Sequence, residues 1–315
     1  MILGQREYFG REHYEAHAGL APPHLAELVV HCLELVAALS SRGLAFRFKG
    51  GNSLLVLLED PQRFSIDVDV VTTVDKADLT GHVAAVTEES DVFSRWESRA
   101  PKTKPWLPLV SYKLFFASVY QPADAAFVML DAVLAPPAYP GTRRRVRCGA
   151  LYDAPVEVEV PTVSGLIGDK LLTIGPSTLG IPIGKNKEAQ RLKHVFDVAT
   201  LSRRGYDAET VRESLRATRA QEESIQGRSF AWREILDDTR RFCGLPLDHA
   251  TPPAPAATSD PYLAEIARGF EEFRRHLFRA PYGWDALQAD CRRVLGVLDE
   301  VRAAVASLHP AFELP

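Results

Sequence analysis

The chain changes character at Pro161: strand-like patterns dominate before this residue and helical patterns dominate after it. Before Pro161, short runs of alternating or continuous apolar residues indicate strands at 64–71, 109–119, 127–134, 144–151 and 156–160. After it, apolar residues recur every three or four positions and indicate helices at 162–174, 188–204, 207–220, 230–242, 261–277 and 284–308. We therefore predict an α+β fold: an N-terminal lobe with a mixed sheet and helices over 1–160, then a helical lobe over 161–315. A linker-like, Pro-rich stretch covers 250–261.

Charge and hydropathy exclude several classes of protein. The 37 basic and 41 acidic side chains give a net charge of -4, which excludes a broadly basic nucleic-acid binder but not a local basic site. The most apolar early stretch, 28–39, is interrupted by His31 and Glu34 and is too short and polar to span a bilayer. The N-terminus is charged too early for a signal peptide. We expect a cytoplasmic protein that does not associate with membranes.

The run from Phe64 to Val71 carries two carboxylates on one strand face. Asp67 and Asp69 alternate with apolar residues, so their Cα atoms lie about 6.5–7 Å apart. Two carboxylates at this spacing can share a hard cation such as Mg²⁺ with substrate phosphates. The alternative is an edge strand whose solvated face merely tolerates Asp.

A glycine turn precedes this run. Gly50-Gly51-Asn52-Ser53 stands between a strand at 44–48 and a short helix at 54–58. Glycines permit a tight turn and a close approach of phosphate to the backbone, and amides at a helix N-terminus favour anions. We expect Asn52 or Ser53 to cap the helix or to bind phosphate oxygens; the alternative is a plain Gly-Gly turn.

Two blocks of sequence together resemble the AbiEii/AbiGii toxin family. In the first, Phe48 to Leu54 followed by Arg63 to Asp69 resembles the family pattern K-G-G-T-x-L, then R-[FY]-S-x-D-[LI]-D. In the second, Gly168 to Leu172 resembles E-K-x-x-A, and Arg191 to Leu201 resembles R-x-x-[RK]-D-x-[YF]-D-L-x-x-L. The departures are Asn52 for Thr, Asp169 for Glu and His194 for Asp.

This resemblance implies a fold and an activity. Members belong to the nucleotidyltransferase superfamily and are toxins of type IV toxin–antitoxin systems. The implied reaction depends on Mg²⁺ (or Mn²⁺) and adds nucleotides from an NTP, with CTP favoured, to the 3′ end of tRNA, which blocks translation. The implied partners are an NTP, the tRNA acceptor end and an antitoxin protein. The alternatives are an enzyme of the same fold that modifies a protein or small-molecule hydroxyl, and an inactive member that only binds.

The resemblance and the residue chemistry together nominate the site residues. The expected catalytic residues are Asp67, Asp69, Lys170 and Asp197. The expected metal ligands are Asp67, Asp69 and Asp131, the last in an apolar run where an unpaired Asp would be costly. The expected nucleotide-binding residues are Lys49, Gly50, Gly51, Asn52, Ser53, Ser65, Lys185, Lys187, Arg191 and Lys193. Three alternatives stay open: Lys193 and Asp197 as an ordinary helix pair, Lys49 as a surface lysine, and a solvated rather than a closing loop around Lys185.

Regulation and RNA contact have separate candidates. In related toxins a Ser or Thr at the position of Ser65 can be phosphorylated by the antitoxin, which places negative charge where a triphosphate binds. The basic run from Arg143 to Arg147 is the best candidate RNA contact, or else it neutralises Glu157 and Glu159. A second basic, aromatic-containing candidate comprises Lys102, Lys104, Trp106 and Lys113.

Overall fold

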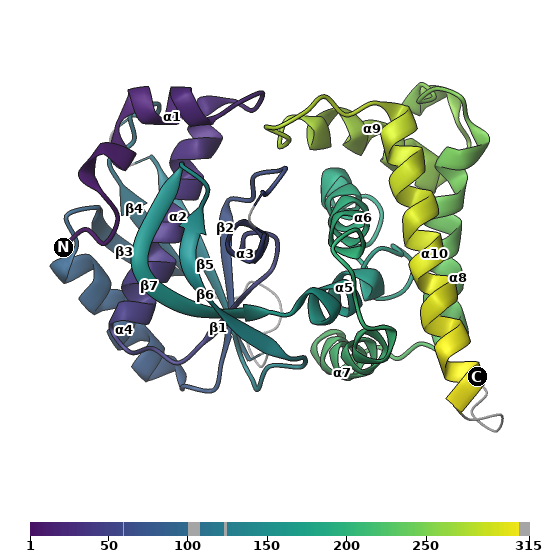
Figure 1. Ribbon diagram of the computed structural model, residues 1–315, viewed down its shortest axis with the longest axis horizontal. Helices are drawn as coiled ribbons and strands as arrows, with labels where there is room; N and C mark the ends of the chain where they lie inside the picture. The colour runs from purple at the N-terminus through teal and green to yellow at the C-terminus, as the bar shows by residue number, and fades with distance from the viewer. Residues whose placement is uncertain (59, 100–107, 123–124, 309–315) are drawn as a thin grey trace. The chain divides into compact units, whose positions relative to one another are not determined.

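The computed structural model describes residues 1–58, 60–99, 108–122 and 125–308 (Figure 1). The candidate RNA-contact residues Lys102, Lys104 and Trp106 lie outside the described residues. The chain divides into two compact units, each described here by itself. Unit 1 comprises Met1–Pro137, Gly141–Pro161 and His276–Ala280, and unit 2 comprises Ala138–Pro140, Thr162–Arg275 and Pro281–Pro315.

Unit 1 is built on a mixed sheet, as predicted. Its described strands lie in the order β3-β4-β5-β2-β1-β7-β6. Their bounds are β1 Arg47–Lys49, β2 Asp67–Thr72, β3 Phe93–Arg99, β4 Leu109–Phe116, β5 Phe127–Leu134, β6 Gly141–Cys148 and β7 Tyr152–Pro161. The pairs β2–β5 and β1–β7 are parallel, and the other neighbours are antiparallel.

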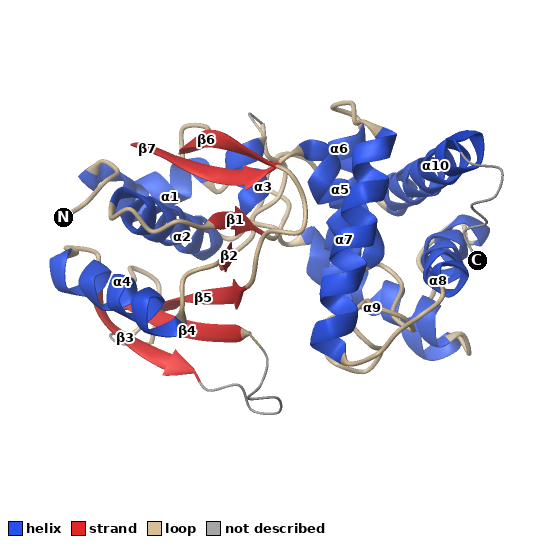
Figure 2. Ribbon diagram, turned by 90° about the horizontal axis from the view of Figure 1, so that it is seen from below, coloured by secondary structure: helices blue, strands red, loops and turns tan. Residues whose placement is uncertain are grey.

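Helices bury one face of this sheet. The 3-10 helix η1 (Arg6–Phe9) and helices α1 (Arg11–His17), α2 (Pro23–Ser41), α3 (Ser53–Leu57) and α4 (Lys76–Glu89) belong to unit 1. Alternate residues such as Val68, Val70 and Leu130 are fully buried, in one hydrophobic cluster with apolar residues of α2 and α4. These two helices lie on the same side of the sheet (Figure 2). Among the described residues, α2 alone has the length and apolarity of a membrane span, but 72% of that stretch is buried, as in a core helix.

β6 ends earlier than the strand predicted at 144–151, and β7 begins earlier than the strand predicted at 156–160. Asp153 to Pro155 lie inside β7, and the chain turns at 149–151. A proline is tolerated in this strand because the register against β6 shifts between Arg145 and Arg147, so the missing N–H falls at an irregularity of the ladder. The carboxylate strand is also shorter than predicted, since β2 begins only at Asp67.

Unit 2 consists of helices. They are α5 Val163–Leu172, α6 Glu188–Ser202, α7 Ala208–Gln226, α8 Trp232–Gly244, α9 Pro261–Arg274 and α10 Trp284–Leu308, with short 3-10 helices η2 Leu245–Asp248 and η3 Pro255–Ala257. The side chain of Thr162 caps α5, because it accepts a hydrogen bond from the amide of Gly165. The linker-like stretch is ordered at its end, where Asp260 caps α9 through the amides of Tyr262 and Leu263.

Candidate functional site

A row of polar residues crosses the sheet of unit 1 at the level of Asp69. In register, Lys49 on β1 is the partner of Asp69 on β2, Asp69 is the partner of Asp131 on β5, and Asp131 is the partner of Ser111 on β4. Cross-strand partners project from the same face of a sheet, so these four side chains share one face. Asp67 shares it as well, because it lies two residues before Asp69.

The carboxylates of this row are supported rather than isolated. The Ser111 hydroxyl donates a hydrogen bond to Asp131 Oδ1, and the ammonium-bearing Lys49 is the register neighbour of Asp69. Asp67 is exposed, whereas Lys49, Asp69 and Asp131 are half-buried. The neighbouring positions of β5, Val128, Leu130 and Ala132, are buried on the opposite face. The Asp131 that the sequence places in an apolar run therefore lies on the face away from the core, which it shares with Asp69.

The glycine turn lies against this carboxylate row. Gly50 has a φ of +69°, and a Cβ built on it would lie 2.8 Å from Cγ of Asp69. A Cβ on Gly51 would lie 2.7 Å from Oγ of Ser65 and 2.8 Å from an Nη of Arg63. The turn thus brings bare backbone next to a carboxylate, a hydroxyl and a guanidinium. Only glycine satisfies both the left-handed conformation and the contact at residue 50.

Gly50→Ala is expected to damage activity more than stability. Its left-handed backbone costs about 1–2 kcal/mol for an L-residue, and the added methyl group overlaps the Asp69 carboxylate. A displacement of about 1 Å in a catalytic group can cost 10²-fold in rate. Gly43→Ala is the matched control, because Gly43 has a φ of +78° and no atom within 4 Å of its Cβ position. The unfolding temperature should fall in both variants, and further in Gly50→Ala because of the contact with Asp69; equal activity of the two variants would contradict the placement of Gly50.

Asn52 and Ser53 do not take the roles predicted for them. Both are fully buried, and the helix α3 that follows has no side-chain cap. The Ser53 hydroxyl donates to the carbonyl of Gly50 at 2.9 Å, and the Asn52 amide donates to the carbonyl of Asp67 at 3.3 Å. These two side chains therefore tie the turn to itself and to β2, and they are not expected to contact phosphate. α3 has only five residues, and so short a helix has too small a dipole to attract an anion to its N-terminus as expected.

Arg63 was not nominated by sequence reasoning, although it stands in the R-F-S-x-D pattern. It is buried, and Nη1 donates to the carbonyl of Phe64 at 3.1 Å. Its other Nη lies beside Gly51, near the Ser65 hydroxyl. Ser65 itself precedes β2 instead of lying in it. Arg63 therefore places a positive charge next to the glycine turn, where an anion would be favoured.

The donors at this site fit a magnesium ion held partly by its substrate. Among the described residues, no three His, Cys, Asp or Glu side chains are gathered tightly enough to hold a metal by themselves. Mg²⁺ typically takes one or two carboxylates, with phosphates and waters completing its shell. Asp67, Asp69 and Asp131 offer such oxygen donors on one sheet face, so the predicted ligand set remains a proposal that suits this metal.

A cysteine lies beneath the carboxylates. Cys32 of α2 is buried, and its thiol donates to the carbonyl of Ile66 at 3.2 Å. Burial raises the pKa of the Cys32 thiol well above its usual value, and the nearby negative charge of Asp67 raises it further. The thiol is therefore neutral and packs as a small apolar side chain.

In unit 2, Lys170 and Asp197 form a buried ion pair. Lys170 Nζ lies 2.7 Å from Asp197 Oδ2, and the two side chains are only 3% and 1% exposed. Asp197 of α6 thus contacts Lys170 of α5 and can orient its ammonium group. A buried pair of this kind has a high desolvation cost, and hydrophobic replacements are often at least as stable. Its presence suggests that something other than stability keeps the two charges there.

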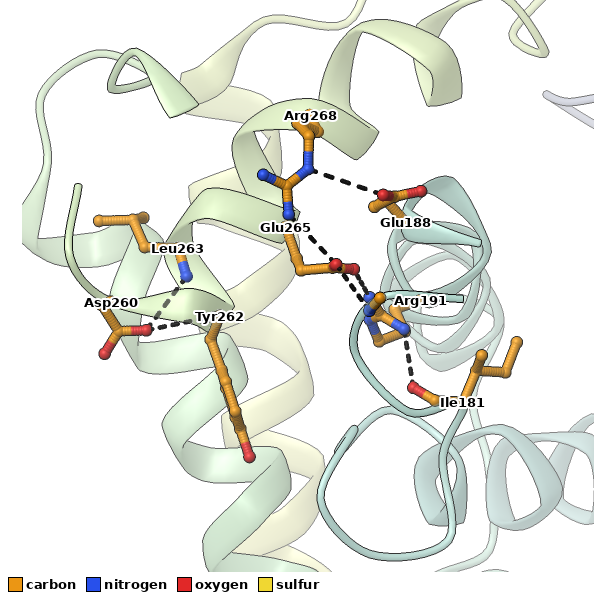
Figure 3. Close-up of polar contacts among 9 residues, drawn as sticks. Ile181, Glu188, Arg191, Asp260, Tyr262, Leu263, Glu265 and Arg268 are labelled. Carbon is orange, nitrogen blue, oxygen red and sulfur yellow. Dashed lines mark hydrogen bonds and ion pairs between the residues drawn. The ribbon is translucent and has the colours of Figure 1, made fainter. Parts of the chain in front are cut away.

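The nucleotide-binding role predicted for Arg191 does not fit the structure. Arg191 is 1% exposed, forms an ion pair with Glu265 of α9, and donates to the carbonyl of Ile181 at 2.7 Å (Figure 3). Burial lowers the pKa of Arg191, and the neighbouring Glu265 opposes that change. This guanidinium joins α6, α9 and the preceding loop, so we assign it a structural role.

The predicted closing loop is held in place over most of its length. The Asp238 carboxylate accepts hydrogen bonds from the amides of Ser177 and Thr178 at 2.8 and 2.9 Å, and Glu265 accepts one from the amide of Gly184 at 3.1 Å. Lys185 and Lys187 follow this anchor and are exposed, whereas Lys193 is half-buried on α6. The loop therefore presents two lysines from an anchored base.

Comparison with known proteins identifies one sequence family. The family described as nucleotidyl transferase AbiEii toxin, type IV TA system, matches residues 33–290, which is more than half of the chain. The match includes the glycine turn, the carboxylate row and the Lys170–Asp197 pair. No curated protein matches the chain by sequence.

Solved structures give a similar fold at low sequence identity. MenT4, a nucleotidyltransferase toxin from Mycobacterium tuberculosis H37Rv, matches with a TM-score of 0.51 and 14% identity over 93% of this chain and 99% of that chain. An antigenic nucleotidyltransferase-like protein from Paracoccidioides brasiliensis has a TM-score of 0.37 and 14% identity over 67% of this chain and 94% of its own. The first likeness supports the α+β fold, and the second is too weak to carry an argument.

Proposed function

The chain belongs to the AbiEii family, the nucleotidyltransferase toxins of type IV toxin–antitoxin systems, and on this basis we propose that it adds nucleotides to the 3′ end of tRNA. The donor is a nucleoside triphosphate, with CTP favoured, and Mg²⁺ (or Mn²⁺) is the metal. We place the enzyme in the cytoplasm, where tRNA and its antitoxin partner are found. The carboxylate row next to the glycine turn is the observation that carries this proposal.

The row and the turn suit nucleotidyl transfer. The RNA 3′-hydroxyl attacks the α-phosphorus of the triphosphate, its proton leaves with a base, and pyrophosphate departs. Such a reaction needs alignment and neutralisation of charge more than covalent chemistry from the protein. When bound, the metal neutralises the triphosphate; Asp67, Asp69 and Asp131 would hold it.

Each unit also carries cationic side chains that we assign to the reaction. Lys49 lies beside Asp69 and can reach phosphate oxygens, and the bare backbone of Gly50 and Gly51 allows a phosphate to come close. We assign Lys170 to transfer and Asp197 to positioning Lys170, and we assign Lys185, Lys187 and Lys193 to triphosphate contacts. Each of these assignments in unit 2 rests on the family pattern together with the residue chemistry.

One labelling experiment tests the function. The protein is incubated with each α-labelled NTP in turn, Mg²⁺ and total tRNA, beside Asp67→Ala. We expect label on tRNA, most strongly with CTP, and none with the variant. Label on a protein or a small molecule would instead indicate the same fold acting on a different hydroxyl. If neither reaction labels any acceptor, the proposed transfer is wrong.

Ser65 offers a test of regulation. A phosphate on Ser65 would place negative charge beside the glycine turn. We expect Ser65→Asp to lower transfer by about 10²-fold, since like charges brought together cost several kcal/mol. Ser65→Ala should lose no more than about fivefold, the cost of one neutral hydrogen bond. Mass spectrometry after coexpression with the neighbouring gene product would detect the modification; an unmodified Ser65 in an inactive preparation would contradict phosphorylation as the regulatory step.

A further inference from the structure

A groove of about 500 Å³ lies between the edge strand β6 and the end of α3 in unit 1. Val56, Leu57 and Leu58 line it on one side, and Arg144, Arg145 and Arg147 on the other. The register of β6 shifts between Arg145 and Arg147, and such bulges re-aim side chains. A fourth arginine, Arg279, approaches the same place, with an Nη 3.9 Å from the Cβ position of Gly149.

The arginines of β6 fall into two kinds. Arg143 pairs with Glu157 at 3.3 Å and Arg145 pairs with Asp153 at 2.6 Å, while Glu159 pairs with Arg47 rather than with this run. Arg144 and Arg147 form no ion pair within the described part of the chain. Among the described residues, Arg144 donates only to the Thr142 hydroxyl and the Arg143 carbonyl, and Arg147 only to the Gly149 carbonyl at 3.4 Å. The alternative role predicted for this run is to neutralise Glu157 and Glu159. That role does not account for Arg144 and Arg147, two of the four arginines of β6.

The groove is close to the proposed reaction centre. α3 begins directly after the glycine turn and ends at the groove. From Ser53 to Leu57 the helix rises about 6 Å, roughly the axial rise of two nucleotides in one strand of a double helix. A polynucleotide whose 3′ end lies at the glycine turn must lay its preceding phosphates on a surface at about this distance.

We propose that Arg144 and Arg147 bind the phosphodiester backbone of the RNA substrate in this groove. The inference rests on the proposed function, because it assumes an RNA acceptor. Arginine forks bind phosphate oxygens in pairs and keep their charge at all physiological pH values. Charged side chains on an edge strand also hinder pairing with other sheets, but that role needs no groove and no unpaired arginines.

The salt dependence of RNA binding tests the proposal. The affinity of labelled tRNA is measured for the wild type, for Arg144→Ala/Arg147→Ala, and for Arg95→Ala/Arg99→Ala. The last pair is the matched control, because it removes two arginines from β3 at the opposite edge of the sheet. We expect the groove variant alone to lose about tenfold in affinity and to lower the slope of log K against log salt by about 1.4–1.8, two phosphate contacts' worth. The KM for the NTP and the unfolding temperature should stay at the wild-type values.

The possible outcomes separate this inference from the proposed function. If the wild type labels tRNA and the groove variant keeps both the wild-type affinity and slope, the groove does not bind RNA. An equal loss in both variants would overturn the inference too, since it would reflect long-range charge alone. If the groove variant instead loses only capture of the coexpressed antitoxin, the ligand is a protein and not RNA. If the wild type labels no RNA but still binds tRNA with the predicted slope change in the groove variant, the groove stands and the proposed reaction fails.

Discussion

Asp69→Asn is expected to lower the rate of nucleotide transfer by at least about 10³-fold. The variant should remain folded and should be no less stable than the wild type. Asp69 lies at the centre of the polar row, between Lys49 and Asp131, so a neutral amide would remove the charge that the proposed metal and its triphosphate need. The same change relieves the repulsion between two facing carboxylates, which costs about 0.2–1 kcal/mol across a strand pair. Activity and stability should therefore move in opposite directions.

Labelled-nucleotide transfer and thermal unfolding without added metal measure the two effects. Asp67→Asn should behave in the same way, since Asp67 shares the face of Asp69. Glu97→Gln is the matched control: Glu97 lies on the edge strand β3 of the same sheet and pairs with Arg95, so it should retain full transfer. A loss of stability as large as that of a core mutation in Asp69→Asn would show that this carboxylate is a structural residue.

Local patterns predict much of this fold. The apolar run at 127–134 and the helical period of 284–308 coincide with β5 and α10, because apolar length and period are properties of the segment itself. α4 and β3 escaped prediction: within α4 only Leu79, Val83 and Val86 are buried, and β3 buries only Phe93. Such weakly amphipathic elements depend on their tertiary neighbours more than on their own pattern.

The sequence predicts only those features of the candidate site that depend on local spacing. The shared face of Asp67 and Asp69 follows from their spacing, because the period of a strand is two. The alignment of Lys49, Asp131 and Ser111 with Asp69 depends on strand order and register, which are set by contacts between distant segments. Burial has the same non-local origin: Ser53 and Arg191 carry functional groups of the right kind, yet the packed chain encloses both.

The buried pair of Lys170 and Asp197 gives the second large effect. Asp197→Ala would leave the Lys170 ammonium buried without its partner, which costs about 3–5 kcal/mol. For a unit of this size, that loss corresponds to a fall of roughly 10 °C in unfolding temperature. The double variant Lys170→Met/Asp197→Leu replaces both charges with apolar groups, and we expect it to recover the lost stability. If Lys170 acts in transfer, the double variant should remain inactive although it is folded.

The pair of Arg191 and Glu265 is the matched control for this experiment, because it is equally buried in the same unit and links α6 to a neighbouring helix. Arg191→Met/Glu265→Leu removes no group that we assign to the transfer step, but it frees the loop at Gly184 from its Glu265 anchor. Its transfer rate per folded molecule should therefore fall only in part, whereas Lys170→Met/Asp197→Leu should show no transfer. Unfolding and transfer are measured on all variants at the same temperature, below the lowest midpoint. Recovery of both stability and transfer by Lys170→Met/Asp197→Leu would make Lys170 a structural residue. Recovery of stability without recovery of transfer would show that the fold tolerates the loss of both charges, whereas the reaction requires the Lys170 ammonium.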